Sequence, residues 1–342
     1  MWLLLAGLLL RLVSGLAFLF VGTALAGCAI AVANVLLPVL VRRDFPAHTG
    51  TAMGAFTALL IGFAALAAGV TVPIANALGG GWRPGLAIWT FPAAVAALVW
   101  LPVLPRQGGH PPADLPADAP DAPRAGEVRR LLRHPLAWQL TLFFALQSGG
   151  FYAALAWLPN IFRSHGFDEA HAGALLSLSL VVGLFAALIF PRWAERFRDQ
   201  RLLVLASCLL TASGWIGLLL APRSGAYAWA VLLGLGQQAQ LPLVFMLIVL
   251  RSRSVSDAAS LSTMAQSIGY ALAALGPLAV GALHGATHSW TPEVILLLAV
   301  LGPQLLLGLA SARNRYLFPE EPEPDQVQDG DQATGAGPAL TR

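Results

Sequence analysis

The chain has 342 residues, of which 57% are hydrophobic and only 11% are charged, and its mean hydropathy is +0.71. Soluble domains carry about 25% charged residues, so a large soluble helical protein is hard to reconcile with this composition. The formal net charge of +3 rests on 20 basic residues that are all arginine, and they stand in short segments between apolar runs, which argues against a nucleic-acid partner.

Apolar runs follow one another along the whole chain. In order they are Trp2–Leu10, Leu16–Val41, Met53–Ile74, Leu86–Val103, Pro135–Phe162, Ala172–Phe190, Leu202–Leu220, Ala226–Leu250, Leu261–His284 and Pro292–Ala312. All but the first are long enough to cross about 30 Å of hydrocarbon at about 1.5 Å per residue. The first run is too short, and we interpret it as the end of a helix whose beginning is absent. The sequence therefore predicts an all-α polytopic membrane protein.

Two segments differ from these runs in composition. Residues 104–134 are rich in Pro, Gly, Asp and Arg, and residues 313–342 are acidic and rich in Pro. We interpret the first as a linker and the second as a disordered tail. The predicted organisation is therefore a helical half at 1–103, a linker at 104–134, a six-helix half at 135–312 and a tail at 313–342.

Arginine placement predicts the orientation of the chain. If each span crosses once, Arg11, Arg83, Arg163 and Arg223 lie on one side, which leaves sixteen of the 20 arginines on the other side with the linker and the tail. Arginines collect on the cytoplasmic side of membrane proteins. The linker and the C-terminus are therefore predicted to be cytoplasmic, in a bacterial inner membrane.

The two halves share a weak repeat. Arg42 precedes Trp82 by 40 positions, and Arg251 precedes Trp290 by 39, with one Gly/Ala-rich span in each interval. If the halves are equivalent, the first lacks two helices at its N-terminus. Six plus six helices with a long central cytoplasmic loop is the pattern of the major facilitator superfamily, which this chain resembles.

A basic loop carries part of that resemblance. FPRWAERFRDQR, residues 190–201, is similar to the cytoplasmic loop that latches helices together in the superfamily. The resemblance implies a latch of Arg192, Arg196, Asp199 and Arg201. The alternative is ordinary positive-inside arginines, but an Asp among them favours ion pairing.

Four motifs resemble the cyanate/nitroimidazole branch of the superfamily more narrowly. They are LQSGGFYAALAWLP at 146–159, ANVLLPVLVRRDFP at 33–46, Leu250-Arg251-Ser252, and AASLSTMAQSIGYALAALGP at 258–277. The branch carries a pathway-facing Asn-Leu-Arg-Pro-like motif in its first helix, and no residue here can take that role. The resemblance implies transport of a small solute such as cyanate, nitrate or a nitroimidazole.

Polar residues at mid-span depth are the candidate solute contacts. A solute that crosses a membrane must exchange water for protein groups near the midplane. The candidates are Gln147, Ser148, Tyr152, Gln237, Gln240, Gln266, Tyr270 and Asn34. The alternative role for each is a hydrogen bond that holds helices together, at about 1 kcal/mol.

No charged residue lies near the predicted midplane of a span, so the sequence shows no proton relay. A cavity lined by amides and tyrosines suits a small solute that is neutral or singly charged. Cys28 and Cys208 stand apart from any metal-ligand pattern, and no catalytic or cofactor motif is present. We therefore expect a monomeric transporter in the lipid bilayer, not an enzyme, without cofactor or metal. Two alternatives stay open: an incomplete pseudo-transporter or scaffold, and a multidrug exporter.

Overall fold

The computed structural model describes residues 1–44, 49–100, 130–196, 199–313 and 315–317, and every regular element in this part is a helix. The helices are α1 (Trp2–Leu10), α2 (Leu16–Asp44), α3 (Thr49–Ala77), α4 (Trp82–Ala87), α5 (Thr90–Trp100), α7 (Pro135–Ser164), α8 (Glu169–Arg196), α9 (Arg201–Leu220), α10 (Ala226–Arg251), α11 (Val255–Ala273), α12 (Leu275–Thr287) and α13 (Thr291–Ser311). Among the described residues, 9 stretches are helical, long and apolar enough to cross a membrane.

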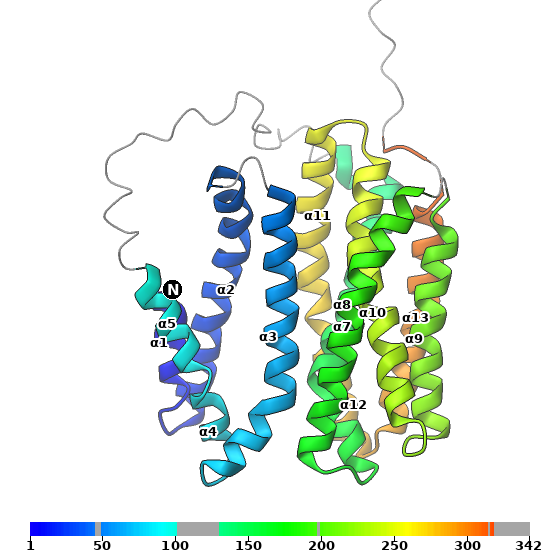
Figure 1. The fold of residues 1–342 in the computed structure, drawn as a ribbon. Coiled ribbons are helices and arrows are strands. Elements are labelled where there is room, and N and C mark those ends of the chain that lie inside the picture. The colour runs from blue at the N-terminus through cyan, green and yellow to red at the C-terminus, as the bar shows by residue number, and fades with distance from the viewer. Residues whose placement is uncertain (45–48, 101–129, 197–198, 314, 318–342) are drawn as a thin grey trace, which may run out of the picture.

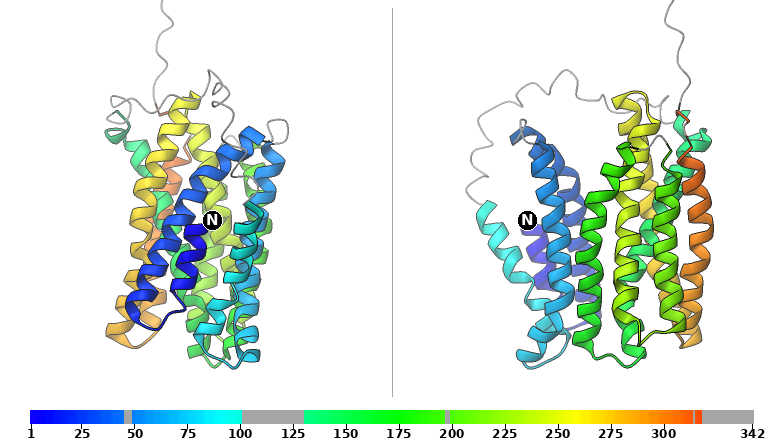
Figure 2. Two further views of the ribbon diagram at one scale, coloured as in Figure 1. Left: turned by 90° about the vertical axis from the view of Figure 1, so that its left-hand side faces the viewer. Right: turned by 45° about the vertical axis from the view of Figure 1, so that its right-hand side comes forward.

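The helices run side by side between two ends of the molecule (Figures 1 and 2). We call the end with Asp44 and Arg251 the linker end, which is at the top of Figure 1. The end with Ala77 and Thr287 is the opposite end. Long helices that run from one end to the other, as α2, α3, α7, α8, α9, α10 and α13 do, are what a bilayer requires.

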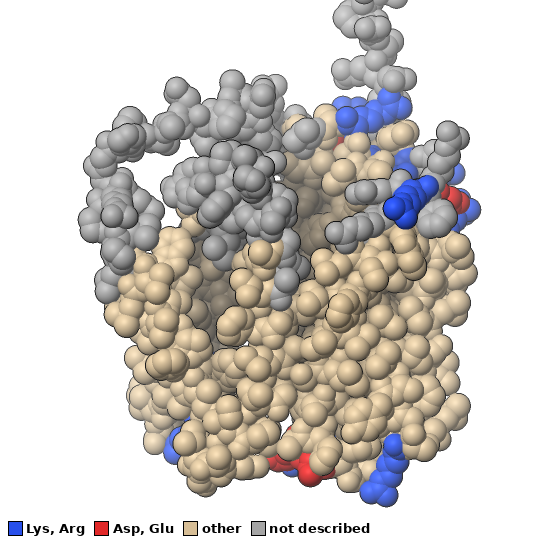
Figure 3. Space-filling view, in the orientation of Figure 1, with Lys and Arg blue, Asp and Glu red and all other residues tan. Residues whose placement is uncertain are grey.

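The outer surface is apolar between these two ends. Figure 3 shows a wide tan band, with charged side chains above and below it. Large apolar side chains such as Phe20, Phe91, Leu220 and Leu306 are strongly exposed. A soluble protein does not tolerate such a surface, whereas lipid covers it at no cost.

Two groups of helices, α1–α5 and α7–α13, meet where α3 packs against α8. Small residues allow this contact, because a Cβ added to Gly173 of α8 would stand 2.5 Å from the carbonyl oxygen of Ala68 in α3. Glycine therefore sets how closely the two groups approach each other.

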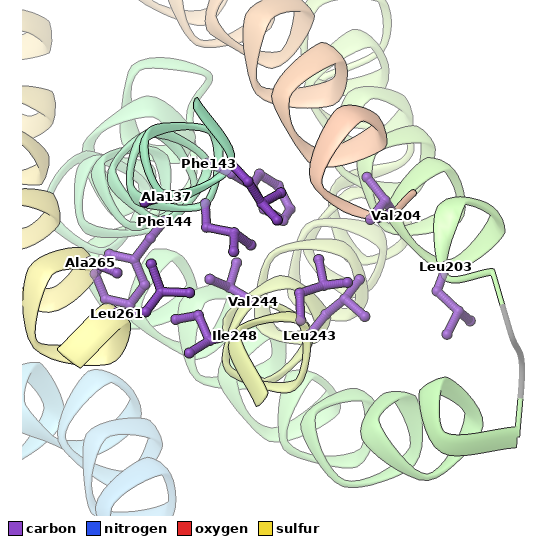
Figure 4. Packing of buried hydrophobic residues seen from close by; sticks show 14 of the residues in the cluster. Ala137, Phe143, Phe144, Leu203, Val204, Leu243, Val244, Ile248, Leu261 and Ala265 are labelled. Carbon is purple, nitrogen blue, oxygen red and sulfur yellow. The ribbon is translucent and has the colours of Figure 1, made fainter. Parts of the chain in front are cut away.

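The second group has its own packed interior. Figure 4 shows part of it, where Phe143 and Phe144 of α7 lie among Val244 and Ile248 of α10 and Leu261 of α11. A further cluster towards the opposite end includes Trp215 and Phe162. These two clusters hold α7 at the centre of the group, so side chains at the middle of α7 have fixed surroundings.

Two runs that we expected to form single helices are interrupted. The run Leu261–His284 is split between α11 and α12 at Ala274, and the run that begins at Leu86 is split between α4 and α5. Proline lacks the N–H that would bond the carbonyl four residues earlier. Pro277 cannot donate to the Ala273 carbonyl where α11 ends. Pro92 cannot donate to the Ile88 carbonyl, which instead accepts a 3.2 Å hydrogen bond from the Phe91 N–H between α4 and α5.

The C-terminal segment packs on the linker end before the described residues stop. The Leu317 N–H donates a 2.8 Å hydrogen bond to the Arg251 carbonyl, and the Leu317 side chain is fully buried. The Arg253 guanidinium lies 4.7 Å from the centre of the Tyr316 ring. The first residues of the predicted tail therefore contact the bundle. Residues 318–342 and residues 104–129 of the predicted linker lie outside the described residues.

Candidate functional site

The centre of α7 holds a buried polar pair. Gln147 and Ser148 are both buried, and Gln147 Nε2 donates a 2.6 Å hydrogen bond to Ser148 Oγ. Beside them, the Gly149 carbonyl lies so close to Gly276 of α12 that a Cβ on Gly276 would collide with it. The absence of a side chain at Gly276 therefore lets α12 pack closely against α7 next to Gln147 and Ser148.

Two tyrosines from different helices lie together and stay partly open. Tyr152 of α7 and Tyr270 of α11 have ring centroids 6.4 Å apart, and they are 40% and 39% exposed. Phe144 contacts Tyr270 edge-on at 4.9 Å, and Phe151 contacts Tyr152 at 5.4 Å. Aromatic neighbours therefore hold both tyrosine rings in place, and the phenol O–H groups can form hydrogen bonds with a solute.

Gln266 lies one helical turn before Tyr270 and is half-buried. Its Nε2 donates a 2.9 Å hydrogen bond to Ser262 Oγ. The break at Ala274 follows Tyr270 by another turn. Interrupted helices commonly line the solute sites of transporters, because their backbone groups become available there.

The glutamines of α10 have a different environment. Gln240 Oε1 accepts a 2.6 Å hydrogen bond from Gln304 Nε2 of α13, and Gln240 Nε2 donates to Thr211 Oγ1 of α9 at 3.3 Å. Gln237 is buried as well, and Gln238 fills the space that Gly183 of α8 leaves. The contacts of Gln240 therefore join three helices, which is the interhelical role that we set against the pathway role.

Two further candidates stand partly outside the described structure. Asn34 belongs to α2 and Arg192 to α8, but the side chains of both lie outside the described residues.

Two buried polar residues, Gln304 and Glu293, are not among the candidates that the sequence indicates. Each is a single polar residue in an apolar setting, and only its buried contacts distinguish it.

Glu293 is fully buried at the start of α13. Its Oε1 accepts a 2.9 Å hydrogen bond from Thr287 Oγ1 and lies 3.7 Å from His284 Nδ1. The His284 ring stacks on Trp290 with centroids 3.8 Å apart. These contacts fasten the hairpin between α12 and α13 at the opposite end.

At the linker end, the proposed latch residues Arg196, Asp199 and Arg201 are exposed. Asp199 Oδ1 accepts a 3.0 Å hydrogen bond from the Arg201 backbone N–H. Arg251 is only 3% exposed, and its guanidinium donates to Gln200 Oε1 and to the carbonyls of Ser311 and Ala312. Arg251 therefore connects the start of α9 to the ends of α10 and α13, beside the residues in which we expected the latch.

A cavity of about 730 Å³ lies at the opposite end. Its walls come from α3, α4, α7 and α8, together with Arg11 and Leu19. The described structure thus contains a partly open tyrosine pair on α7 and α11 and a separate cavity, lined by a few polar and charged side chains, between the two helix groups.

Comparison with known families identifies this architecture. Residues 1–274 match the model of the Major Facilitator Superfamily. The chain belongs to this superfamily. It is therefore a membrane transporter for a small molecule, and not an enzyme.

Three relatives that align with most of this chain are named as transporters. The "Uncharacterized transporter YycB" of Bacillus subtilis (strain 168) is 39% identical over 93% of this chain and 77% of its own length. The "2-nitroimidazole transporter" of Escherichia coli (strain K12) is 36% identical over 91% and 77%. The "Cyanate transport protein CynX" of the same organism is 29% identical over 89% and 77%.

A solved structure shares the fold. The crystal structure of a bacterial homolog to the human lysosomal transporter Spinster, in an inward-facing and unoccupied conformation, superposes with a TM-score of 0.61. The match has 16% sequence identity and covers 91% of this chain and 78% of the other. At this identity the likeness concerns the fold, which agrees with an all-helical major facilitator arrangement.

Proposed function

We propose that this chain moves a small planar solute, neutral or singly charged, of the nitroimidazole, cyanate or nitrate type. The tyrosine pair carries the proposal. Two phenols from two different helices keep about two fifths of their surface open within a well-packed group. A planar solute can stack on an aromatic ring and accept a hydrogen bond from a phenol.

The neighbours of the tyrosine pair support the same class of solute. Gln147, Ser148 and Gln266 supply amides and hydroxyls on the same two helices, and these groups suit a solute with little or no charge. The relatives named for 2-nitroimidazole and for cyanate transport point to the same range of solutes. Gln237 and Asn34 remain further candidates for the pathway.

The two helix groups supply the movement in this proposal. Alternating access in such folds is a rocking of one group against the other around a central site. In the contact of α3 with α8, Gly173 lies against the Ala68 carbonyl and Gly69 lies against the small Ser177 side chain, so no bulky side chain stands at either glycine. Such a contact can shift without repacking large residues.

The test is uptake by the purified full chain in proteoliposomes, with 2-nitroimidazole, cyanate and nitrate supplied in turn. We expect uptake of at least one of these solutes. Tyr152→Phe and Tyr270→Phe should each lower it about tenfold, the usual loss for one hydrogen bond to a bound group. Tyr227→Phe, at the start of α10 and exposed, is the matched control and should transport normally.

Wild-type vesicles that took up none of the three solutes would refute the proposal and favour a non-transporting scaffold. Full uptake by both phenylalanine variants would show that the phenol groups of Tyr152 and Tyr270 do not contact the transported solute. Broad efflux of unrelated apolar compounds would favour a multidrug exporter.

We propose in addition that the linker end faces the cytoplasm, as the arginine distribution predicts. A green fluorescent protein fused after Arg342 should fluoresce and an alkaline phosphatase fused there should be inactive. The reverse result would invert the orientation.

A further inference from the structure

The cavity at the opposite end contains an excess of positive charge. The charged residues that line it are Arg11, Arg163 and Glu169. Arg163 Nη2 is paired with Glu169 Oε1 at 2.6 Å, so these two charges compensate each other. Two positive charges and one negative charge leave one positive charge, that of Arg11, uncompensated within the cavity lining.

Arg11 is held against α2 and is incompletely bonded. A Cβ on Gly22 of α2 would stand 2.8 Å from Arg11 Cγ, so the arginine stem passes over the glycine. Its Nε is buried, and the described residues provide no hydrogen-bond partner for this atom. A buried N–H of a cation without an acceptor is costly, and an anion bound at the guanidinium would offset part of this cost.

Neutral donors surround the same space. Asn76 of α3 and Asn160 of α7 line the cavity, and both carry amide N–H groups. Trp82, at the start of α4, adds an exposed aromatic ring to the wall. One net positive charge, amide donors and a flat ring match a small anion of charge −1 better than a cation or a polyanion.

The cavity and the tyrosine pair lie along one side of α7. Tyr152, Pro159 and Arg163 are spaced by seven and four residues, which places them on a common helix face. All three are at least partly exposed. Eleven residues at about 1.5 Å each separate Tyr152 from Arg163 by about 16 Å along the helix. An anion in the cavity that Arg163 lines would therefore stand near the helix face that leads to Tyr152.

We propose that this cavity is a second binding site, an antechamber that takes a small water-soluble monoanion at Arg11 before or after it visits the tyrosine pair. The role as an antechamber rests on the transport proposed above, whereas the binding itself does not. A monoanion could also come from a lipid headgroup, so the test separates the two sources.

The test measures binding without transport. The full chain is placed in phosphatidylcholine nanodiscs, and the midpoint of thermal unfolding is followed against sodium nitrate, with sodium gluconate keeping the ionic strength constant. A ligand that binds only the folded protein raises this midpoint with its concentration. Effects of nitrate on the solvent act equally on all variants, so differences between variants report the site.

Four substitutions give different expectations for nitrate binding. Arg11→Gln should weaken nitrate binding about tenfold, because one charged hydrogen-bond donor is lost, and Arg11→Lys should retain most of the binding. Glu169→Gln, which removes the negative charge next to Arg163, should tighten it several-fold. Tyr227→Phe, at the exposed start of α10 and outside both sites, should leave nitrate binding unchanged.

Equal nitrate responses in wild type, Arg11→Gln and Glu169→Gln would overturn the proposal. Loss of the response when phosphatidylglycerol is added to the nanodiscs would overturn it too, because the site would then belong to a lipid phosphate. A failed antechamber is distinguishable from a failed transport proposal, since uptake of 2-nitroimidazole that is insensitive to Arg11→Gln would leave the transport proposal intact.

Discussion

Tyr152 and Gln240 illustrate how similar polar residues acquire different roles in an apolar helix. Both lie in the middle of a span, and both could be identified from the sequence as polar groups at that depth. Their surroundings differ: Tyr152 is 40% exposed beside a second tyrosine, whereas Gln240 is buried and bonded to Gln304 and Thr211. Exposure depends on residues that are distant in the sequence, so the sequence alone could not separate a solute contact from an interhelical bond.

The bond between Gln240 and Gln304 leads to a prediction on stability. Gln304→Leu leaves Gln240 Oε1 buried without this donor, which should cost about 1–3 kcal/mol of unfolding free energy. The double variant Gln240→Leu/Gln304→Leu should lose less than the sum of the two single variants, because both partners are then apolar.

Thermal unfolding in a fixed detergent checks this expectation. Transport per folded molecule should remain close to that of the wild type, since these residues do not belong to the tyrosine pair. Additive losses in the double variant would show that the two amides act independently.

At the scale of the helices, most of the fold could be predicted from the sequence. Apolar runs gave every long helix of the described structure, because a span requires about 20 apolar residues. The interruptions at Ala274 and between α4 and α5 were missed. Proline often stays within a helix, as Pro159 does in α7 and Pro242 does in α10, so its presence alone does not identify a break.

The second half of the interrupted α11–α12 span gives an element-scale prediction. Gly276→Ala places a Cβ against the Gly149 carbonyl, and this contact is backbone to backbone and cannot relax by a rotamer change. We expect a loss of about 1–3 kcal/mol in unfolding free energy.

Gly285→Ala is the matched control in the same helix, since a Cβ there meets nothing within 4 Å. Alanine favours a helix over glycine by about 1 kcal/mol, so this variant should be neutral or slightly stabilising. Similar thermal midpoints for both variants would contradict the close approach of α7 and α12.

For the whole molecule, the contact between the two helix groups gives a direct test of rocking. A Cβ on Gly69 of α3 would stand 3.3 Å from Ser177 Cβ of α8, close to the separation in disulfides of about 3.5–4.5 Å. In a background of Cys28→Ser and Cys208→Ala, the pair Gly69→Cys/Ser177→Cys should form a disulfide on oxidation.

We expect this cross-link to remove most of the uptake, because it fixes α3 to α8 near the opposite end, and dithiothreitol should restore it. The single-cysteine variants are the controls and should respond to neither reagent. Undiminished uptake by the fully cross-linked protein would show that α3 and α8 move as one body during transport.

The docking of Leu317 on Arg251 has a practical consequence for protein production. Ending the chain after Ala312 removes a fully buried leucine and a hydrogen bond to the end of α10. Ending it after Leu317 keeps both. We expect the shorter version to elute as aggregate in detergent and the longer one to elute as a single peak in size-exclusion chromatography. Affinity tags and reporter fusions therefore belong after residue 317.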